Sequence, residues 1–471
     1  MIDLIINGAT VLTMADGVGY LNDASIGIND GKIVFIAEQG DETLNKYNAN
    51  RYISGKDKLI MPGLIDAHMH TEISIFRGLA QDLNNWMELG LWPFSQHLDR
   101  EAAEAAIRLN IMESVKKGTT TLGDFGSEID LIASTCQDFG VRGVLTKTIN
   151  ELDQKYPAEP GQLYNFDYKK GKKDLESALN IIEKYKSDDL LDFNFGPQAL
   201  DMVSLDLLKE VYKQAKNLDI QIHMHVAQGD REDWQIEKRY GDRTIPFLHK
   251  NNLLGPELRA VHLTEASPEE TILLAESGAA LTICSGSIGI IDGLVPPLLE
   301  FLKISDRISL GSDQAPGNNC NNMFNEMKLT SLFNKIKSSD PTNLNAGQIL
   351  QFATNKAAES LNISEKVGSI APGKEADLLF IDLKSPALNP VINSPLRNIV
   401  PNLVYSASGE EVESVMISGK FVVKDNKFLP ADEDEVINNA NLEAKRLMTK
   451  VDKDWLQDKS PIFKLQEKGY L

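Results

Sequence analysis

Two histidines one residue apart, His68 and His70, end the apolar stretch 59–70. Alternate residues of a strand point to the same face, so both imidazoles would project together at the C-terminal end of a strand. Two imidazoles that converge in this way can share one metal ion. Pro62 and Gly63 indicate a turn at which a preceding domain passes into this strand. A His-x-His pair is weak support for a metal site on its own, because histidines are also buried for packing.

Three further residues with the same chemistry stand at the ends of strand-like segments farther along the chain. They are His225, His262 and Asp313. With His68 and His70, they would bring four imidazoles and one carboxylate to one rim. Neutral imidazole and carboxylate ligands suit Zn²⁺ or Fe²⁺, and the absence of thiolate ligands leaves the choice between these ions open, with zinc as the first expectation.

Each of these residues also has an ordinary structural explanation. A single histidine at a strand end is commonly a hydrogen-bonded core residue, and an aspartate after Gly-Ser can be a helix cap. Their joint placement is what favours a metal site. His223 shares a face with His225 but lies deeper in the barrel, which favours a structural role. We expect His97 and His249 to be incidental, because they lie in helical or loop contexts.

The sequence between these residues alternates strand-like and helix-like patterns. Helical stretches such as 99–117 and 204–217 separate the strands. Eight strand–helix units over about 300 residues predict an α/β fold, a (β/α)8 TIM barrel, whose chemistry lies at the C-terminal ends of its strands. The expected strands lie near 59–67, 119–124, 141–147, 190–196, 219–225, 258–262, 279–284 and 307–312.

Two β-rich segments flank this middle section. Residues 1–58 contain short apolar runs separated by Asn-Gly and Asp-Gly turns, the signature of a small antiparallel sheet. A matching segment returns at 366–430. Together they predict one composite β-sandwich domain, with the barrel of residues 59–365 inserted between its halves. The charged helical extension 431–471 is expected to form a surface helix or an oligomer contact.

The composition limits the partners and the compartment. The formal charge is 48 − 68 = −20, which argues against nucleic acid and anionic membranes as partners. Within the 471 residues we find neither an apolar run that could span a bilayer nor a secretory signal. The widely spaced Cys136, Cys284 and Cys320 form neither a disulfide framework nor a zinc motif, and a cytoplasmic location is the simplest interpretation.

Several motifs resemble, in order and spacing, those of the amidohydrolase superfamily, and more narrowly those of its deaminases and triazine chlorohydrolases. The resemblance covers nearly the whole chain. It implies that His68, His70, His225 and Asp313 hold one divalent metal ion per subunit, with His262 just outside as a polarising group and proton partner. It also implies a homodimer or tetramer. The motifs are residues 62–70, 77–82, 92–93, 118–121, 225–228, 311–313 and 368–378.

The positions that would contact the substrate depart from the family pattern. Gln228 stands where members usually carry the Glu that delivers a proton to a ring nitrogen in deaminases, although some triazine hydrolases also carry Gln there. Ser95, shortly after Trp92, stands where the nucleoside deaminases carry a Glu that holds ribose hydroxyls. Gln198 stands where they carry His. The metal ligands therefore match the family pattern, whereas the residues expected to contact the substrate do not. This argues against an adenosine-type nucleoside substrate.

The chemistry of such a site follows from its residues. A metal ion lowers the pKa of a bound water toward about 7, and Asp313 can accept the proton that this water releases. His262 can stabilise the negative charge that develops at the attacked carbon. Gln198, Gln228 and Asn318 place amide groups near the rim that can pair with ring nitrogens. Asn318 can equally serve the backbone of its turn.

The expected reaction is hydrolysis of a small nitrogen heterocycle by an aminohydrolase that releases ammonia. The alternative is the release of chloride or a substituted amine from a triazine-like ring, or the opening of a cyclic amide or urea, because Gln228 cannot supply a proton. A non-catalytic binding or assembly module is a third interpretation. The retention of all the metal-site residues disfavours it.

Overall fold

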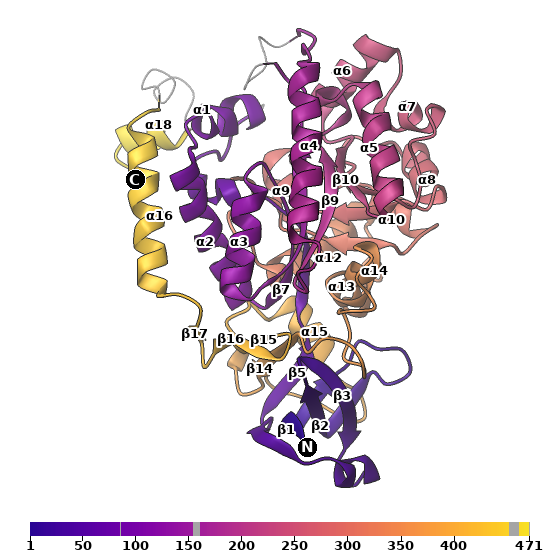
Figure 1. Cartoon of the computed structure of the whole chain (residues 1–471), viewed down its shortest axis with the longest axis vertical. Coiled ribbons are helices and arrows are strands. Elements are labelled where there is room, and N and C mark those ends of the chain that lie inside the picture. The colour runs from indigo at the N-terminus through magenta and orange to yellow at the C-terminus, as the bar shows by residue number, and fades with distance from the viewer. Residues whose placement is uncertain (85, 154–160, 452–460, 471) are drawn as a thin grey trace.

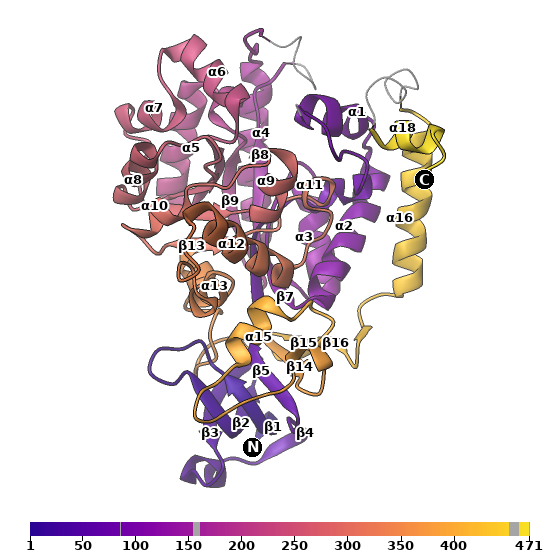
Figure 2. The same cartoon turned by 180° about the vertical axis from the view of Figure 1, so that it is seen from behind.

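The computed structural model of the chain describes residues 1–84, 86–153, 161–451 and 461–470. A sheet built from both ends of the chain lies at one end of the molecule, and a barrel surrounded by helices lies above it (Figure 1). The N-terminus lies in the sheet, and the C-terminal helices run along one side of the barrel (Figures 1 and 2).

Among the described residues, eight parallel strands form the barrel in the order in which they occur along the chain. The first and last strands meet through a single bridge, between Met69 and Asp313. The (β/α)8 barrel with a composite β domain that the sequence predicts is thereby confirmed. The barrel strands are β6 (Leu64–Met69), β7 (Thr119–Gly126), β8 (Arg142–Ile149), β9 (Leu191–Pro197), β10 (Ile222–Val226), β11 (Leu258–His262), β12 (Ala280–Ile283) and β13 (Ile308–Leu310).

Helices follow these strands and cover the outside of the barrel. Local capping residues define several of them: the Asp99 carboxylate accepts from the N–H of Ala102 at the start of α2, and Ser267 and Glu270 form a capping box at the start of α8. The helices are α1 (Trp92–Ser95), α2 (Arg100–Lys116), α3 (Ile129–Phe139), α4 (Tyr168–Tyr185), α5 (Leu205–Leu218), α6 (Asp230–Tyr240), α7 (Thr244–Lys250), α8 (Pro268–Glu276), α9 (Ser285–Ile291), α10 (Leu298–Leu302), α11 (Ala315–Asn318), α12 (Met323–Ser338), α13 (Ala346–Phe352), α14 (Asn355–Ser360), α15 (Ile399–Tyr405), α16 (Glu433–Met448) and α18 (Pro461–Glu467).

The described parts of the two chain ends form one nine-stranded sheet. Its hairpins are antiparallel, but β1 also pairs in parallel with β4 and β5, so the sheet is mixed rather than purely antiparallel. Strands β5 and β14 pair directly and join the two halves. The strands are β1 (Ile2–Leu12), β2 (Tyr20–Asn29), β3 (Lys32–Glu38), β4 (Ala49–Ser54), β5 (Lys58–Pro62), β14 (Leu378–Asp382), β15 (Val412–Ile417), β16 (Lys420–Lys424) and β17 (Lys427–Phe428).

The turn that Pro62 and Gly63 indicate divides the stretch into two strands, so the barrel strand that the sequence predicts near 59–67 begins only at Leu64. β5 belongs to the composite sheet and β6 to the barrel, and the chain passes between them at Gly63. The N–H of Gly63 donates to the backbone oxygen of Asp377 at 3.0 Å. A Cβ at Gly63 would lie 1.9 Å from the Thr120 hydroxyl oxygen, so only glycine fits this approach to β7. The strand that carries His68 and His70 therefore continues directly from the composite sheet.

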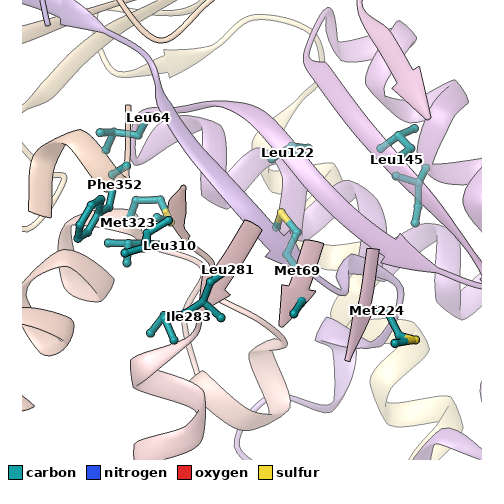
Figure 3. Packing of buried hydrophobic residues seen from close by; sticks show 14 of the residues in the cluster. Leu64, Met69, Leu122, Leu145, Met224, Leu281, Ile283, Leu310, Met323 and Phe352 are labelled. Atoms are coloured by element: carbon teal, nitrogen blue, oxygen red, sulfur yellow. The ribbon is translucent and has the colours of Figure 1, made fainter. Parts of the chain in front are cut away.

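Alternation along the strands separates the hydrophobic core from the site. Met224 of β10 packs in the hydrophobic cluster with Leu122, Leu145 and Leu281, whose side chains are drawn in Figure 3. The residues on either side of Met224 are histidines, and their rings contact other imidazoles instead. The hydrophobic packing therefore fixes which face of each strand turns toward the polar interior of the barrel.

The C-terminal helix α16 packs along α2 (Figures 1 and 2). Leu447 is buried with Phe76 and Phe94, and Arg446 forms an ion pair with Asp99. This surface helix therefore braces the segment that contains α1. Among the described residues, no helix combines the length and the apolar character needed to cross a membrane.

A buried ion pair joins the barrel to the composite sheet. Arg142, at the start of β8, is fully buried, and its Nε donates to the Asp377 carboxylate at 2.8 Å. The same carboxylate accepts from the backbone N–H of Ser418 at 2.8 Å, and the Ser418 hydroxyl accepts from Arg142 at 2.9 Å.

Candidate metal centre and substrate cavity

Three imidazoles converge at the C-terminal ends of β6 and β10. The ring centroid of His68 lies 4.7 Å from that of His70 and 4.9 Å from that of His225, and the latter two lie 5.5 Å apart. Ligand atoms of His68, His70 and His225 lie within 4.8 Å of one another, and so do ligand atoms of His68, His262 and Asp313. The structure thus brings together the five residues that the sequence predicts at one rim of the barrel.

The Nδ1 atom of each of these three imidazoles has a hydrogen-bond partner. His70 Nδ1 lies 2.6 Å from the backbone oxygen of Phe125, and His225 Nδ1 lies 2.8 Å from that of Gln198. A carbonyl oxygen only accepts, so both rings carry their proton on Nδ1 and leave Nε2 free. His68 differs, because its Nδ1 lies 2.9 Å from Nε2 of another imidazole, that of His223.

Asp313 closes the barrel at the seam between its last and first strands. Its backbone N–H donates to the backbone oxygen of His68 at 2.8 Å. Its φ of +60° is left-handed, a conformation that a non-glycine residue adopts at a cost of about 1–3 kcal/mol and that often marks functional sites. Oδ2 accepts a hydrogen bond from the Ser287 hydroxyl. Oδ1 faces the histidines, 3.5 Å from His70 Nε2 and 3.7 Å from His68 Nε2.

His262 ends β11, also with a left-handed backbone, at φ +79°. Its ring centroid lies 5.3 Å from that of His225 and 5.4 Å from that of His68. The ring is fully buried, and neither of its nitrogens has a hydrogen-bond partner among the described residues. An imidazole placed in this way has both nitrogens available for chemistry.

The unpartnered atoms fit a bound cation. Within the described chain, His68 Nε2 and Asp313 Oδ1 are also buried without hydrogen-bond partners. An unsatisfied buried polar atom costs about 1–3 kcal/mol, and here several face one another. Imidazole nitrogens with one carboxylate oxygen are a donor set that zinc accepts. The residues therefore fit a divalent ion held by His68, His70, His225 and Asp313.

Burial shifts the protonation equilibria of these groups. It lowers the pKa of His70 to about 4 and that of His262 to about 3, and it holds the pKa values of His68 and His225 well below the usual range. The imidazoles are therefore neutral at physiological pH, the form that binds metal ions.

The buried state of His70 predicts a pH-dependent difference in stability. The folded pKa is about 4, against about 6.5 in an unfolded chain. Between about pH 6.5 and about pH 4, His70 is protonated in the unfolded chain but stays neutral in the folded chain. The free energy of unfolding therefore falls as the pH drops below about 6.5. For this residue alone the loss is about 2 kcal/mol at about pH 5.

The measurement compares metal-free wild type with His70→Gln by denaturant unfolding at about pH 7.5 and about pH 5. The titrating groups away from His70 cancel in the difference between the two proteins. The free energy of unfolding of the wild type should fall by about 2 kcal/mol relative to the variant. A difference that stays constant between the two pH values would contradict the prediction.

His223 lies behind His68, as its sequence position predicts. It is fully buried, and its Nδ1 lies 2.9 Å from the hydroxyl oxygen of Thr146 on β8. Burial and the guanidinium of Arg259 hold the pKa of His223 well below its usual range, so the ring is neutral. Of the remaining histidines, His249 is exposed on α7 and His97 follows α1. Neither belongs to the imidazole cluster nor lines the cavity beside it.

A cavity of about 430 Å³ opens beside the metal centre. His70 and His225 form part of its wall, next to the amides of Gln198 and Gln228. Gln228 is fixed through its backbone N–H, which donates to the Glu232 carboxylate at 2.9 Å. Trp92 and Ser95 also line this cavity, as do apolar side chains that can enclose a flat ring, namely Ile73, Met87, Leu91, Leu98, Phe125, Leu152 and Met202.

Asn318 does not line this cavity. It is buried in α11, and its side-chain NH₂ donates to the backbone oxygen of Ser312 at 2.9 Å. The sequence allowed this amide either to pair with a ring nitrogen of the substrate or to support the backbone of its turn. The structure shows the second of these contacts. It supports the segment that carries Asp313 and makes no contact with the substrate cavity.

Several polar cavity residues escaped the sequence analysis, and three of them, Glu72, Asn150 and Gln314, share a simple position in the chain. Each lies one or two residues beyond a metal-site residue or a strand end, the positions that face the active end of a barrel. The Glu72 carboxylate accepts from the N–H groups of Ser127 at 3.0 Å and Glu128 at 2.7 Å, at the start of α3. For Glu72, Asn150 and Gln314, the only signal in the sequence was this position after a strand end or a metal-site residue.

Comparison with known proteins places this geometry in a family. A sequence model of the amidohydrolase family matches residues 59–422. The 5'-deoxyadenosine deaminase of Methanopyrus kandleri is 31% identical over 432 residues, which cover 91% of this chain and 96% of the relative.

Two solved structures extend the comparison. An adenosine deaminase from Xanthomonas campestris with bound zinc has a TM-score of 0.87 at 25% identity, covering 95% of this chain and 99% of that one. The atrazine chlorohydrolase of Arthrobacter aurescens, complexed with zinc, has a TM-score of 0.82, covering 94% of this chain and 100% of that one. It is 20% identical, so this likeness concerns the fold alone.

Proposed function

Because the chain belongs to the amidohydrolase family, we propose that it is a metal-dependent aminohydrolase. Its substrate is a small nitrogen heterocycle, from which it removes an amino group as ammonia. The observation that carries this proposal is the convergence of unpartnered ligand atoms of His68, His262 and Asp313 beside a cavity lined by amides. Water addition to an electron-poor ring carbon needs the ligand atoms to activate the water and the cavity to hold the ring.

One divalent ion per chain, zinc first and iron as the alternative, completes the site in this proposal. When bound, such an ion acts as a Lewis acid and lowers the pKa of a water molecule toward about 7. His68, His70, His225 and Asp313 would hold it. Elemental analysis of the purified protein should find about one ion per chain, whereas a non-catalytic binding module would carry no stoichiometric metal.

The chain's own residues supply the proton transfers. Asp313 Oδ1 has no hydrogen-bond partner among the described residues and accepts the proton of the attacking water. The same oxygen then returns the proton to the departing nitrogen, since Gln228 cannot titrate. His262 donates from its ring to the atom on which negative charge develops. The NH₂ groups of Gln198 and Gln228 bind ring nitrogens and orient the substrate.

A second reaction is favoured by one residue, Gln228. Without an acid at this position, a leaving group that needs no proton departs more easily than ammonia. This favours release of chloride or a substituted amine from a triazine-like ring, or the opening of a cyclic amide or urea. The two reactions share the metal ligands and differ only in what leaves the attacked carbon.

A panel of compounds separates these reactions. Purified metal-loaded protein is incubated with triazines, pyrimidines and purines that carry amino, substituted amino or chloro groups, and with cyclic ureas. Mass spectrometry then follows each product. Replacement of NH₂ by OH, with chloro analogues turned over no faster, supports the deaminase. Turnover confined to chloro or substituted-amine compounds supports the alternative, and no turnover of any compound contradicts both.

Nucleosides form a separate arm of this panel. The name of the archaeal relative makes 5'-deoxyadenosine the first nucleoside to include. Ser95 and Gln198 line the cavity where the nucleoside deaminases carry Glu and His, and neither side chain is an ionised partner for ribose hydroxyls. We expect free heterocycles to be turned over faster than their nucleosides.

Replacing Gln228 by Glu should raise the KM for an amino heterocycle about tenfold without raising kcat. The substitution exchanges an NH₂ donor for a carboxylate that repels the electron pair of a ring nitrogen. Steady-state kinetics on the best panel compound measures both constants, with Gln228→Asn as the neutral control. A large gain in amine release at unchanged KM would contradict this and favour the better leaving groups.

Location and assembly complete the proposal. We infer a cytoplasmic enzyme from its three free cysteines, and a homodimer or tetramer from the family resemblance. Native mass spectrometry measures the assembly directly, and a monomer at micromolar concentration would contradict it.

A further inference from the structure

We propose that Thr146 and His223 control which nitrogen of His68 carries the proton, and that metal occupancy reverses the direction of the hydrogen bonds that join these three residues. The inference rests on the proposed metal site and goes beyond the structural role that the sequence indicated for His223. His223 is a positioning residue, because it acts on the metal only through His68.

The three residues form a continuous buried chain across the barrel interior. They lie on β8, β10 and β6, and all three are fully buried. Thr146 Oγ1 lies 2.9 Å from His223 Nδ1, and His223 Nε2 lies 2.9 Å from His68 Nδ1. Every group in this chain can either donate or accept, so geometry alone does not set its direction.

The other two imidazole ligands lack this freedom. Their Nδ1 atoms face the backbone oxygens of Phe125 and Gln198, which accept only. Their Nε2 atoms therefore always present a lone pair. Among the three imidazole ligands, only His68 has a partner that can also donate.

Two arrangements satisfy the chain. In the first, His68 Nδ1–H donates to His223 Nε2, and His223 Nδ1–H donates to Thr146, which leaves a lone pair on His68 Nε2. In the second, the Thr146 hydroxyl donates to His223 Nδ1, and His223 Nε2–H donates to His68 Nδ1. His68 then carries its proton on Nε2, and a protonated nitrogen cannot be a metal ligand.

The surroundings of His68 favour the second arrangement in the metal-free protein and the first arrangement when a metal ion is bound. Without an ion, a proton on His68 Nε2 faces the unpartnered Asp313 Oδ1 at 3.7 Å, which favours the second arrangement. A cation among the ligands requires the lone pair and therefore the first arrangement. Metal binding thus turns the Thr146 hydroxyl from donor to acceptor, deep inside the barrel.

Nitrogen-15 NMR of the wild-type protein tests this directly. The chain has seven histidines, so histidine-selective labelling gives few signals, and two-bond nitrogen–proton couplings identify the protonated ring nitrogen. We expect His223 to be protonated on Nε2 in the metal-free protein and on Nδ1 after one equivalent of zinc. An unchanged His223 tautomer, or Nε2 protonation in the zinc form, would overturn the inference.

Zinc affinity provides a second measurement that does not depend on activity. His223→Leu, which removes the acceptor for His68, should weaken zinc binding about 10- to 100-fold in a chelator competition. His223→Gln, whose side-chain oxygen can accept from His68, should recover most of this loss. Cobalt absorption spectra of the same proteins should show a changed ligand field only for His223→Leu.

A matched pair of threonine variants controls for lost packing. Thr282 is buried on β12, and its hydroxyl lies 2.9 Å from the Ser309 hydroxyl rather than from an imidazole. Thr146→Val should weaken zinc binding about 3- to 10-fold, and Thr282→Val should not change it. Equal zinc affinities for wild type and a folded His223→Leu would overturn the inference, whereas a wild-type protein that binds no zinc would overturn the proposed function itself.

Discussion

The Asp313→Asn variant should lose at least about 10³-fold in kcat while keeping its fold. Asparagine has nearly the same shape, so the Ser287 hydrogen bond and the left-handed backbone can persist. The amide cannot accept the proton of the attacking water, and it is a weaker ligand for a cation. Both losses fall on Oδ1, the atom that faces His68 and His70 at 3.7 and 3.5 Å.

Two measurements separate the causes of this loss. Elemental analysis at saturating zinc shows whether the variant still holds its ion, and kcat on the best panel compound reports the proton transfer. Ser287→Ala is the matched control, since it removes only the hydrogen bond to Oδ2. We expect about a tenfold reduction for the control. If both variants lost activity equally, the loss would come from the changed position of the Asp313 side chain, and the proposed proton transfer through Asp313 would be contradicted.

Removal of the Asp377 carboxylate should produce the largest loss of stability, about 3–5 kcal/mol for Asp377→Ala. The substitution leaves the buried Arg142 guanidinium with only the more distant Glu375 carboxylate, 3.9 Å away, and deprives the Ser418 N–H of its acceptor. A buried cation cannot recover its hydration unless the junction between the barrel and the composite sheet opens. Urea unfolding at neutral pH measures the effect.

An exposed ion pair supplies the control for Asp377. Asp192 pairs with Lys366 at 2.8 Å, with side chains 37% and 42% exposed, so Asp192→Ala should cost less than about 1 kcal/mol. The double variant Arg142→Met, Asp377→Leu should regain much of the lost stability, because it leaves no buried charge. A loss below about 1 kcal/mol for Asp377→Ala would mean that water reaches Arg142 in the folded protein.

The metal residues could be predicted from the sequence because their positions follow from a simple periodicity. His68, His225, His262 and Asp313 each stand at the end of a strand-like segment, and parallel strands in a barrel present these ends at one rim. The identity of each side chain then indicated the chemistry. No knowledge of loop conformation was needed, which is why the structure brings these residues together as the periodicity predicts.

The details that escaped prediction depend on contacts that sequence does not encode locally. The stretch 59–69 is buried on both sides of Gly63, so its apolar pattern does not show that the barrel strand begins only at Leu64. Asn318 lies near the metal site in the sequence, but its amide direction depends on the backbone of Ser312. Asn150 and Gln314 follow strand ends, where one polar residue is indistinguishable from an ordinary turn residue.

The direct pairing of β5 with β14 has a consequence for cooperativity. The chain enters the barrel immediately after β5 and returns to the sheet at β14, and the two strands pair over five positions, from Pro62–Leu378 to Lys58–Asp382. The composite sheet thus holds both ends of the barrel segment together, much as a covalent ring closure would. The barrel and the sheet therefore form a single folding unit, in which loss of the terminal strands frees the strand that carries His68 and His70.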